Sequence, residues 1–310
     1  MNDIVPVIDF ASYAPGDTAN LKRIADAVDT ALSSVGFMAI RNIGLEPGIL
    51  DTVFGQSRTF FGGDAGTKQA SAYRSAAENF GYQGMAEENL DPTAPADLKE
   101  TFTMRDVLNK PPEDGRWPSP KFQSLMTMFY RDCFDAALRL MSVLDVALDN
   151  EPGFFERYHT GENTTLRLLH YPAVRTAAVA PGQLGAGAHT DYGLLTLLFQ
   201  SGVGGLEVQA ADGQWHAVSA DPDAVVINAG DLLEIWTNGR YRSTPHRVQP
   251  KVGNVQRQSI AMFVDPDSAT EVRALASCTG PDNPPRFAPT SAGAHLQERI
   301  EASHKARFAR

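Results

Sequence analysis

Residues 185–200 read GAGAHTDYGLLTLLFQ, and the fold can be inferred outward from this stretch. Small residues come first, then His189, Thr190 and Asp191, and then an apolar run that predicts a strand in the protein interior. A buried histidine or aspartate costs free energy unless a partner compensates it. Side chains two positions apart on a strand point to the same face, so His189 and Asp191 can reach one metal ion.

The composition bounds the class of protein. The chain has 310 residues, of which 43% are hydrophobic and 21% charged, as is typical of a globular protein with a large core. The net charge of -10 disfavours nucleic acid as a partner, because such a surface repels a phosphate backbone. There is no cationic start typical of a signal peptide and no run of about 18 apolar residues. We therefore expect a cytoplasmic protein with small-molecule rather than membrane partners, while the oligomeric state is not indicated.

Two cysteines, Cys133 and Cys278, form neither a CxxC pair nor a zinc-like spacing. So few cysteines fit a reducing compartment. Cys133 falls in an apolar helical pattern, where a buried small hydrophobic side chain is expected.

The period of the apolar residues changes along the chain. The first half predicts helices at 19–36, 46–62 and 119–150, a short strand at 37–44, and long loops over 72–120. From about residue 164, short β-rich runs alternate with turn residues, which is typical of a β-sandwich or barrel. These runs are TTLRLLHY, GLLTLLFQ, GLEVQA, WHAVSA, AVVINA, LLEIWT, RSTPHRV and QSIAMFV. Asn238-Gly239 predicts a hairpin turn, and the tail from 290 to 310 predicts a helix.

A third metal ligand is needed, and His246 in RSTPHRV is the best candidate. His216 follows Trp215 in a hairpin strand, and His295 and His304 fall in the charged C-terminal helix, where solvated side chains are expected. Two histidines and one carboxylate on one face of an octahedron are typical of non-haem Fe(II) centres that activate oxygen.

Arg257 and Ser259 lie in RQSIAMFVD and share one strand face. An arginine fork beside a hydroxyl is suited to hold a carboxylate. This pair, eleven residues after His246, suggests a small diacid with one end on the metal and the other on Arg257.

Together these residues resemble the 2-oxoglutarate- and Fe(II)-dependent oxygenases of the isopenicillin N synthase-like superfamily. The resemblance rests on HTD (189–191), His246 and RQS (257–259), and it extends over essentially the whole chain. Further landmarks are VPVIDF (5–10), GFMAIRNIGL (36–45), KETF (99–102), RWP (116–118), LHYP (169–172) and GDLLEIWTNGRYRSTPHRV (230–248).

The resemblance implies an α+β fold with a double-stranded β-helix (jelly-roll) core. It implies one oxygenase domain over 1–310, with an N-terminal helical and loop region (1–120), scaffold helices (121–163), a catalytic core (164–270) and a C-terminal loop and helix (271–310).

It also implies that His189, Asp191 and His246 bind Fe(II), and that Arg257, Ser259 and Tyr171 bind the distal carboxylate of the co-substrate 2-oxoglutarate. The expected reaction consumes O2, releases succinate and CO2, and hydroxylates, desaturates or cyclises a small molecule, with ascorbate as a reductant in vitro. Leu169 replaces an asparagine frequent in plant members, and His170 replaces an aromatic residue.

Substrate contacts are expected from Phe80 and Tyr82 in a loop, and from Arg167 if it faces inward rather than forming an outward salt bridge. For His170 a structural role is expected first, with a role in the substrate pocket as the alternative. Phe199, Phe263 and the C-terminal helix are candidates for closing the cavity, although core packing suits both phenylalanines. Two alternatives stay open. One is an Fe(II) oxidase of the same superfamily that does not use 2-oxoglutarate, and the other is a non-catalytic jelly-roll protein that binds metal.

Overall fold

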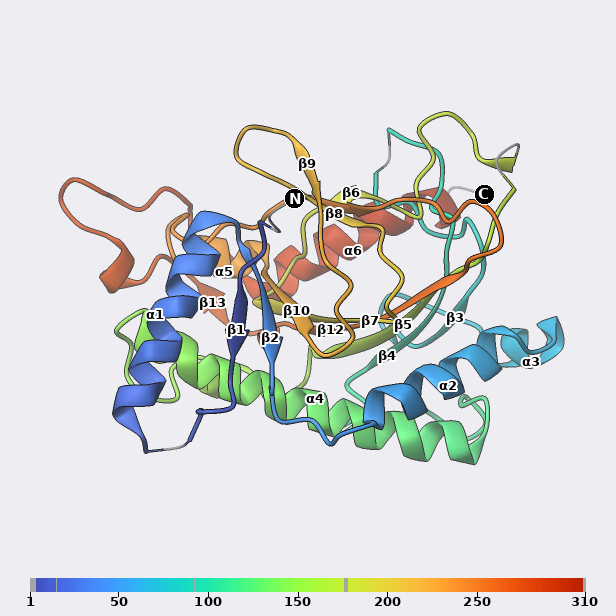
Figure 1. Ribbon diagram of the computed structural model, residues 1–310, viewed down its shortest axis with the longest axis horizontal. Helices are drawn as coiled ribbons and strands as arrows, with labels where there is room; N and C mark the ends of the chain where they lie inside the picture. Colours follow the sequence, from blue (N-terminus) through green and yellow to red (C-terminus); the bar gives the residue numbers. More distant parts are fainter. Residues whose placement is uncertain (1–3, 15, 92, 176–177, 309–310) are drawn as a thin grey trace.

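Two packed β-sheets form the centre of the molecule, as seen in the computed structural model, which describes residues 4–14, 16–91, 93–175 and 178–308 (Figure 1). The large sheet has eight strands in the order β1-β2-β10-β7-β12-β5-β4-β3, and the small sheet has four in the order β6-β11-β8-β9. All neighbouring strands in the two sheets pair antiparallel except β1 and β2. This confirms the α+β class with a jelly-roll core.

The helices and strands of the described chain fall into two groups along the sequence. Those before the catalytic half are β1 (Val7–Asp9), α1 (Thr18–Ser34), β2 (Phe37–Arg41), α2 (Ile49–Phe61), α3 (Ala65–Ala70), β3 (Gly81–Gln83), β4 (Glu100–Arg105), α4 (Pro120–Ala147) and η1 (Glu156–Tyr158). Those that follow are β5 (Thr165–Tyr171), β6 (Ala186–His189), β7 (Leu195–Gln200), β8 (Leu206–Gln209), β9 (Trp215–Ala217), β10 (Val225–Ala229), α5 (Asp231–Trp236), β11 (His246–Val248), β12 (Arg257–Val264), β13 (Glu271–Val272), η3 (Ala276–Cys278), β14 (Thr290–Ser291) and α6 (Ala292–Phe308).

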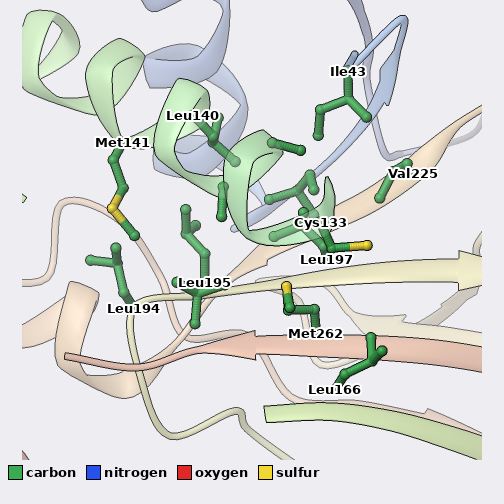
Figure 2. Close-up of a cluster of buried hydrophobic side chains, with 14 of the residues drawn as sticks. Ile43, Cys133, Leu140, Met141, Leu166, Leu194, Leu195, Leu197, Val225 and Met262 are labelled. Carbon is green, nitrogen blue, oxygen red and sulfur yellow. The ribbon is translucent and has the colours of Figure 1, made fainter. Parts of the chain in front are cut away.

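The long helix α4 packs along one face of the large sheet and forms the main core with it (Figure 1). It begins where the sequence predicts, because the Ser119 side chain accepts a hydrogen bond from the Phe122 amide and Pro120 occupies the first turn. Figure 2 shows Leu195, Leu197 and Met262 of the sheet close to Cys133, Leu140 and Met141 of the helix. Cys133 is fully buried among apolar side chains, as expected.

Strand alternation divides each central strand between the core and the site. In β5, Leu166 and Leu168 belong to the core beneath α4, whereas Thr165, Arg167, Leu169 and Tyr171 line a cavity on the opposite face. The strand β12 alternates in the same way, since Ile260, Met262 and Val264 are in the core. Its cavity-facing residues are Arg257, Ser259, Ala261 and Phe263. Because side chains alternate along a strand, those on one face of the large sheet pack against α4 and those on the other face line the cavity.

The stretch GAGAHTDYGLLTLLFQ is not one strand. It forms β6, which ends at His189 in the small sheet, and β7, which begins at Leu195 in the large sheet. The connecting turn packs tightly, because a Cβ on Gly230 would lie 2.3 Å from the Gly193 carbonyl oxygen. The small residues before His189 make room for neighbouring backbone, since a Cβ on Gly187 would lie 2.9 Å from the Asp91 amide nitrogen.

Two secondary-structure predictions in the second half of the chain were wrong. The run LLEIWT is the helix α5 rather than a strand, with Leu232, Leu233 and Trp236 buried at helical spacing; a short apolar run does not distinguish the two structures. Asn238 and Gly239 both have positive φ, as an Asn-Gly turn requires. They end α5, however, because the Gly239 amide donates to the Glu234 carbonyl.

The segment 72–120, expected to be loops, contains two strands, β3 and β4, that extend the large sheet. The tail forms the predicted helix α6 over the part of it that the structure describes. None of the helices in the described residues has the length and apolar character that a membrane crossing requires.

Candidate metal centre and its cavity

His189, Asp191 and His246 converge at the junction of the two sheets. His189 and His246 are directly opposite each other on β6 and β11, with ring centroids 4.3 Å apart. The Asp191 Oδ1 lies 3.9 Å from His189 Nε2 and 3.7 Å from His246 Nε2, and one ligand atom from each residue lies within 4.8 Å of the others. Two imidazoles and one carboxylate, with no thiolate, form a donor set that suits Fe(II).

Backbone contacts orient both imidazole rings toward a common point. The Nδ1 of His189 lies 2.7 Å from the Gly187 carbonyl oxygen, and that of His246 lies 3.2 Å from the Thr244 carbonyl oxygen. A carbonyl oxygen only accepts, so each Nδ1 carries the proton and each Nε2 keeps a lone pair for a metal. Burial, together with the neighbouring His246, lowers the pKa of His189, which keeps its ring neutral.

Two donors that sequence reasoning missed hold the Asp191 carboxylate. Thr196 Oγ1 donates to Asp191 Oδ2 at 2.5 Å, and Asn228 Nδ2 donates to the same oxygen at 2.7 Å. Both are buried on neighbouring strands, β7 and β10. They direct Oδ1 toward the histidines. The only sequence signal was their position in apolar strands, where a polar side chain requires a partner.

A cavity of about 760 Å³ extends from this centre between the sheets. Arg257 and Ser259 both line this cavity. Arg257 is fully buried and donates to Ser259 Oγ at 3.0 Å and to Gln200 Oε1 at 3.2 Å, and its guanidinium lies 4.8 Å from the centre of the Tyr171 ring.

Arg257 nevertheless lacks an anionic partner. Its Nε makes no hydrogen bond, and no described carboxylate forms an ion pair with it. Burial lowers the pKa of its guanidinium. A buried cation without a counter-ion is costly, so this end of the cavity fits an incoming carboxylate such as the distal group of 2-oxoglutarate.

The helix α6 covers another side of the cavity, to which it contributes Leu296, Gln297 and Ile300. Arg299 attaches α6 to the segment between the candidate ligands. Its Nη2 donates to Thr190 Oγ1 at 2.9 Å, and its guanidinium lies 4.7 Å from the centre of the Tyr192 ring.

His295, on the same helix, was expected to be solvated. That expectation was wrong, because its side chain is 19% exposed and its Nε2 lies 3.4 Å from Asp231. The side chain of His304 lies outside the described residues. His216 is half-buried on β9 and does not line the cavity.

Three residues expected to contact substrate do not line the cavity. His170 alternates to the opposite face of β5, where its Nδ1 lies 2.8 Å from Glu100 Oε1. The Tyr82 hydroxyl donates to the same glutamate, and Phe80 packs against Trp117 and Phe102. Phe199 packs on Phe129 of α4 in the core, whereas Phe263 does line the cavity.

Arg167 faces the cavity but is already paired. Its two Nη atoms each lie 3.0 Å from a Glu88 oxygen, and Lys99 Nζ lies 2.9 Å from Glu88 Oε2 and 2.5 Å from Asp97 Oδ2. The four residues form a buried charge network that sequence reasoning missed, although KETF includes Lys99. Glu88 neutralises much of the charge that Arg167 was expected to offer an anionic substrate.

Comparisons with known proteins agree with this geometry. Residues 162–266 match the family model of the 2OG-Fe(II) oxygenase superfamily, and residues 5–122 match that of the non-haem dioxygenase in morphine synthesis N-terminal family. A proline hydroxylase of Petromyces alliaceus is 32% identical over 290 residues, which cover 87% of this chain and 88% of the relative. A 2-oxoglutarate-dependent dioxygenase of Monascus ruber is 30% identical and covers 87% of each chain.

Solved structures extend the similarity to the whole fold. A full-length Neurospora crassa protein crystallised with alpha-KG, which is 2-oxoglutarate, is 30% identical to this chain. The two superpose with a TM-score of 0.87 over 96% of each. The same Neurospora protein has also been solved with alpha-KG and thymine.

Proposed function

Because the chain belongs to the 2-oxoglutarate- and Fe(II)-dependent oxygenase superfamily, we propose that its His189, Asp191 and His246 hold the Fe(II) and that its Arg257 and Ser259 hold 2-oxoglutarate. The protein is an oxidoreductase that couples oxidation of a small molecule by O2 to the conversion of 2-oxoglutarate into succinate and CO2. Bound Fe(II) supplies the oxygen activation. The remaining steps depend on what this chain's residues bind, orient and exclude.

The observation that carries the proposal is the pairing of the His-Asp-His cluster with an uncompensated arginine in one cavity. His189, Asp191 and His246 would hold the metal, and all three residues line the cavity into which a co-substrate would enter. Arg257 fixes one end of the co-substrate, so its other end is presented to the metal. Tyr171 forms the wall of this pocket and stacks on the guanidinium.

The position of α6 suits this helix to keep water out of the cavity. It covers the cavity beside the metal position, and Arg299 fastens it to Thr190. Exclusion of water protects a reactive centre from side reactions. The continuous core beneath α4 supports one domain over 1–310, as proposed from the sequence.

The test is succinate formation by the purified protein with Fe(II), 2-oxoglutarate, ascorbate and O2, measured with and without candidate small molecules. We expect Asp191→Ala to abolish succinate release while the circular dichroism spectrum is retained. The matched control is Asp212→Ala, in an exposed turn where the carboxylate accepts only from the Gln214 amide. Retained activity in Asp191→Ala would remove Asp191 from the metal site, and turnover independent of 2-oxoglutarate would favour the oxidase alternative.

A further inference from the structure

We propose that Asp265 and Arg105 form the substrate-recognition site of this enzyme and that they select a small nitrogen compound carrying an N–H donor and an oxygen acceptor. Asp265 would accept from the N–H group, and Arg105 would donate to the carbonyl or carboxylate oxygen. The inference rests on the proposed function, because it places this compound beside the metal site and opposite 2-oxoglutarate.

Asp265 is a carboxylate without a partner. It follows the last residue of β12 and lines the cavity. No hydrogen bond or ion pair joins its carboxylate to any residue that the structure describes. Carboxylates removed from bulk water are normally hydrogen-bonded, because desolvation otherwise costs free energy. A ligand that donates to Asp265 would remove this cost.

Local packing makes room for this carboxylate. An added Cβ on Gly193 would lie 1.6 Å from Asp265 Oδ1. The absence of a side chain at Gly193 therefore lets the carboxylate lie directly against the backbone, two residues after the candidate ligand Asp191. Asp191 and Asp265 line the same cavity, so a compound held by Asp265 lies in the cavity that contains the metal position.

Arg105 provides the complementary charge. It ends β4, in register with Thr165, and Phe263 is opposite Thr165 from the other side. Its guanidinium donates to Asn163 Oδ1 and to the Glu162 carbonyl oxygen, but it forms no ion pair with a described carboxylate. Arg105 and Asp265 are therefore near each other but not ion-paired.

This arrangement differs from the other charges on the cavity wall. Arg167 and Lys99 are neutralised by Glu88 and Asp97, so they offer little to an incoming ligand. An anion bound at Arg105 alone would leave Asp265 unsatisfied and repelled, and a cation bound at Asp265 alone would leave Arg105 without an anionic partner. A compound with both groups satisfies both side chains.

The protonation of Asp265 is compatible with either type of N–H group. Burial, with the charge of Asp191, raises the pKa of Asp265 to about 8, and Arg105 opposes this rise. A cationic ammonium ligand would favour the ionised carboxylate, whereas a neutral amide would bind with the carboxyl either ionised as an acceptor or protonated as a donor to an adjacent carbonyl. The site therefore fits amino acids and cyclic amides or imides through the same chemistry.

This site is distinct from the 2-oxoglutarate end of the cavity. Ser259 and Asp265 are six residues apart, which along an extended strand is roughly 20 Å. The two ends can therefore be tested independently.

The experiment measures thermal shifts of the intact protein loaded with Mn(II) and 2-oxoglutarate, with the amino acids and pyrimidine bases as bifunctional probes. Benzoate and benzylamine are the anion-only and cation-only probes. Compounds that bind are then tested with Fe(II) for stimulated succinate release. The variants are Asp265→Asn and Arg105→Gln, and the matched control is Asp267→Asn, whose carboxylate accepts from the Thr160 amide and hydroxyl instead.

We expect a bifunctional probe to bind and to stimulate the wild-type enzyme. Each site variant should raise the KM for this probe about 10- to 100-fold and leave the KM for the co-substrate unchanged. A variant that still binds 2-oxoglutarate is folded, so its raised KM for the probe can be assigned to the substrate site. If the proposed function itself were wrong, the wild-type protein would not bind 2-oxoglutarate. Three results would overturn the inference. They are binding confined to the single-charge probes, no binding of any bifunctional probe, and an unchanged KM for the probe in both variants.

Discussion

Thr196→Val should weaken metal binding without removing any metal ligand. The substitution keeps the shape of the side chain and deletes the 2.5 Å hydrogen bond from Thr196 Oγ1 to Asp191 Oδ2. Asn228 would still donate to the same oxygen at 2.7 Å. The carboxylate would therefore stay in place but lose half of the support that directs Oδ1 toward the metal.

Two lines of reasoning give the same size of effect. A hydrogen bond to a charged group contributes about 1.5–3 kcal/mol. Loss of a residue that orients a metal ligand typically lowers metal affinity by about 10- to 100-fold, which corresponds to about 1.4–2.7 kcal/mol. We therefore expect the Kd for the metal to rise by about this factor.

The assay is anaerobic calorimetric titration of Mn(II) into the metal-free protein at fixed pH. The matched control is Thr164→Val, because the Thr164 hydroxyl is buried, makes no hydrogen bond and does not line the cavity. Thr164→Val should leave the Kd unchanged. A Kd within about twofold of wild type in a folded Thr196→Val protein would refute the assignment of Asp191 Oδ1 as a ligand oriented by Thr196.

Three further predictions concern other parts of the molecule. Arg257→Met should stabilise the metal-free protein by about 1–4 kcal/mol, because it removes an uncompensated buried cation. It should also abolish the rise in Tm that 2-oxoglutarate gives the wild type. A lower Tm with intact 2-oxoglutarate binding would contradict this prediction. Burial lowers the pKa of His159 from 6.5 to about 4, so below pH 6.5 the unfolded state binds more protons and stability decreases as the pH falls. Between pH 7.5 and 5, His159 should lower the unfolding free energy measured in urea titrations by about 2 kcal/mol. His159→Gln should remove that share of the pH dependence. An equal slope of unfolding free energy against pH in both proteins would exclude His159 as its source. Arg299→Ala removes the contacts with Thr190 and Tyr192, so hydrogen exchange of α6 amides should accelerate about 5- to 30-fold, and unchanged exchange would show that other contacts hold the helix.

Elements with a strong periodic pattern could be predicted from the sequence. The helix α4 was predicted because its apolar residues recur at helical spacing over 119–150. The short run LLEIWT was not predicted as a helix, because six residues carry too little periodicity to distinguish a strand from a short helix. The strands β3 and β4 lie in a segment rich in turn residues, and they are strands because β4 pairs with β5 and β3 pairs with β4.

The same distinction holds for the candidate site. His189 and Asp191 were predicted as ligands because they are costly polar residues before an apolar run, and His246 was the best candidate for a third ligand. Arg257 and Ser259 were predicted as a carboxylate anchor because they share one strand face. The residues that support them were not identified. Thr196 and Asn228 are ordinary strand residues until the register of β7 and β10 places both on Asp191 Oδ2.

The sequence by itself therefore determined the chemistry of the site, because ligand type and strand spacing are local properties. The tertiary structure alone decided which face each side chain presents and which charges meet. It turned His170 away from the cavity and paired Arg167 with Glu88. It also placed Asp265 and Arg105 on the same cavity wall, with no described residue hydrogen-bonded to the Asp265 carboxylate. The physical reason is that strand register and side-chain pairing depend on residues far apart in the chain, and their free energies exist only once the sheets have assembled.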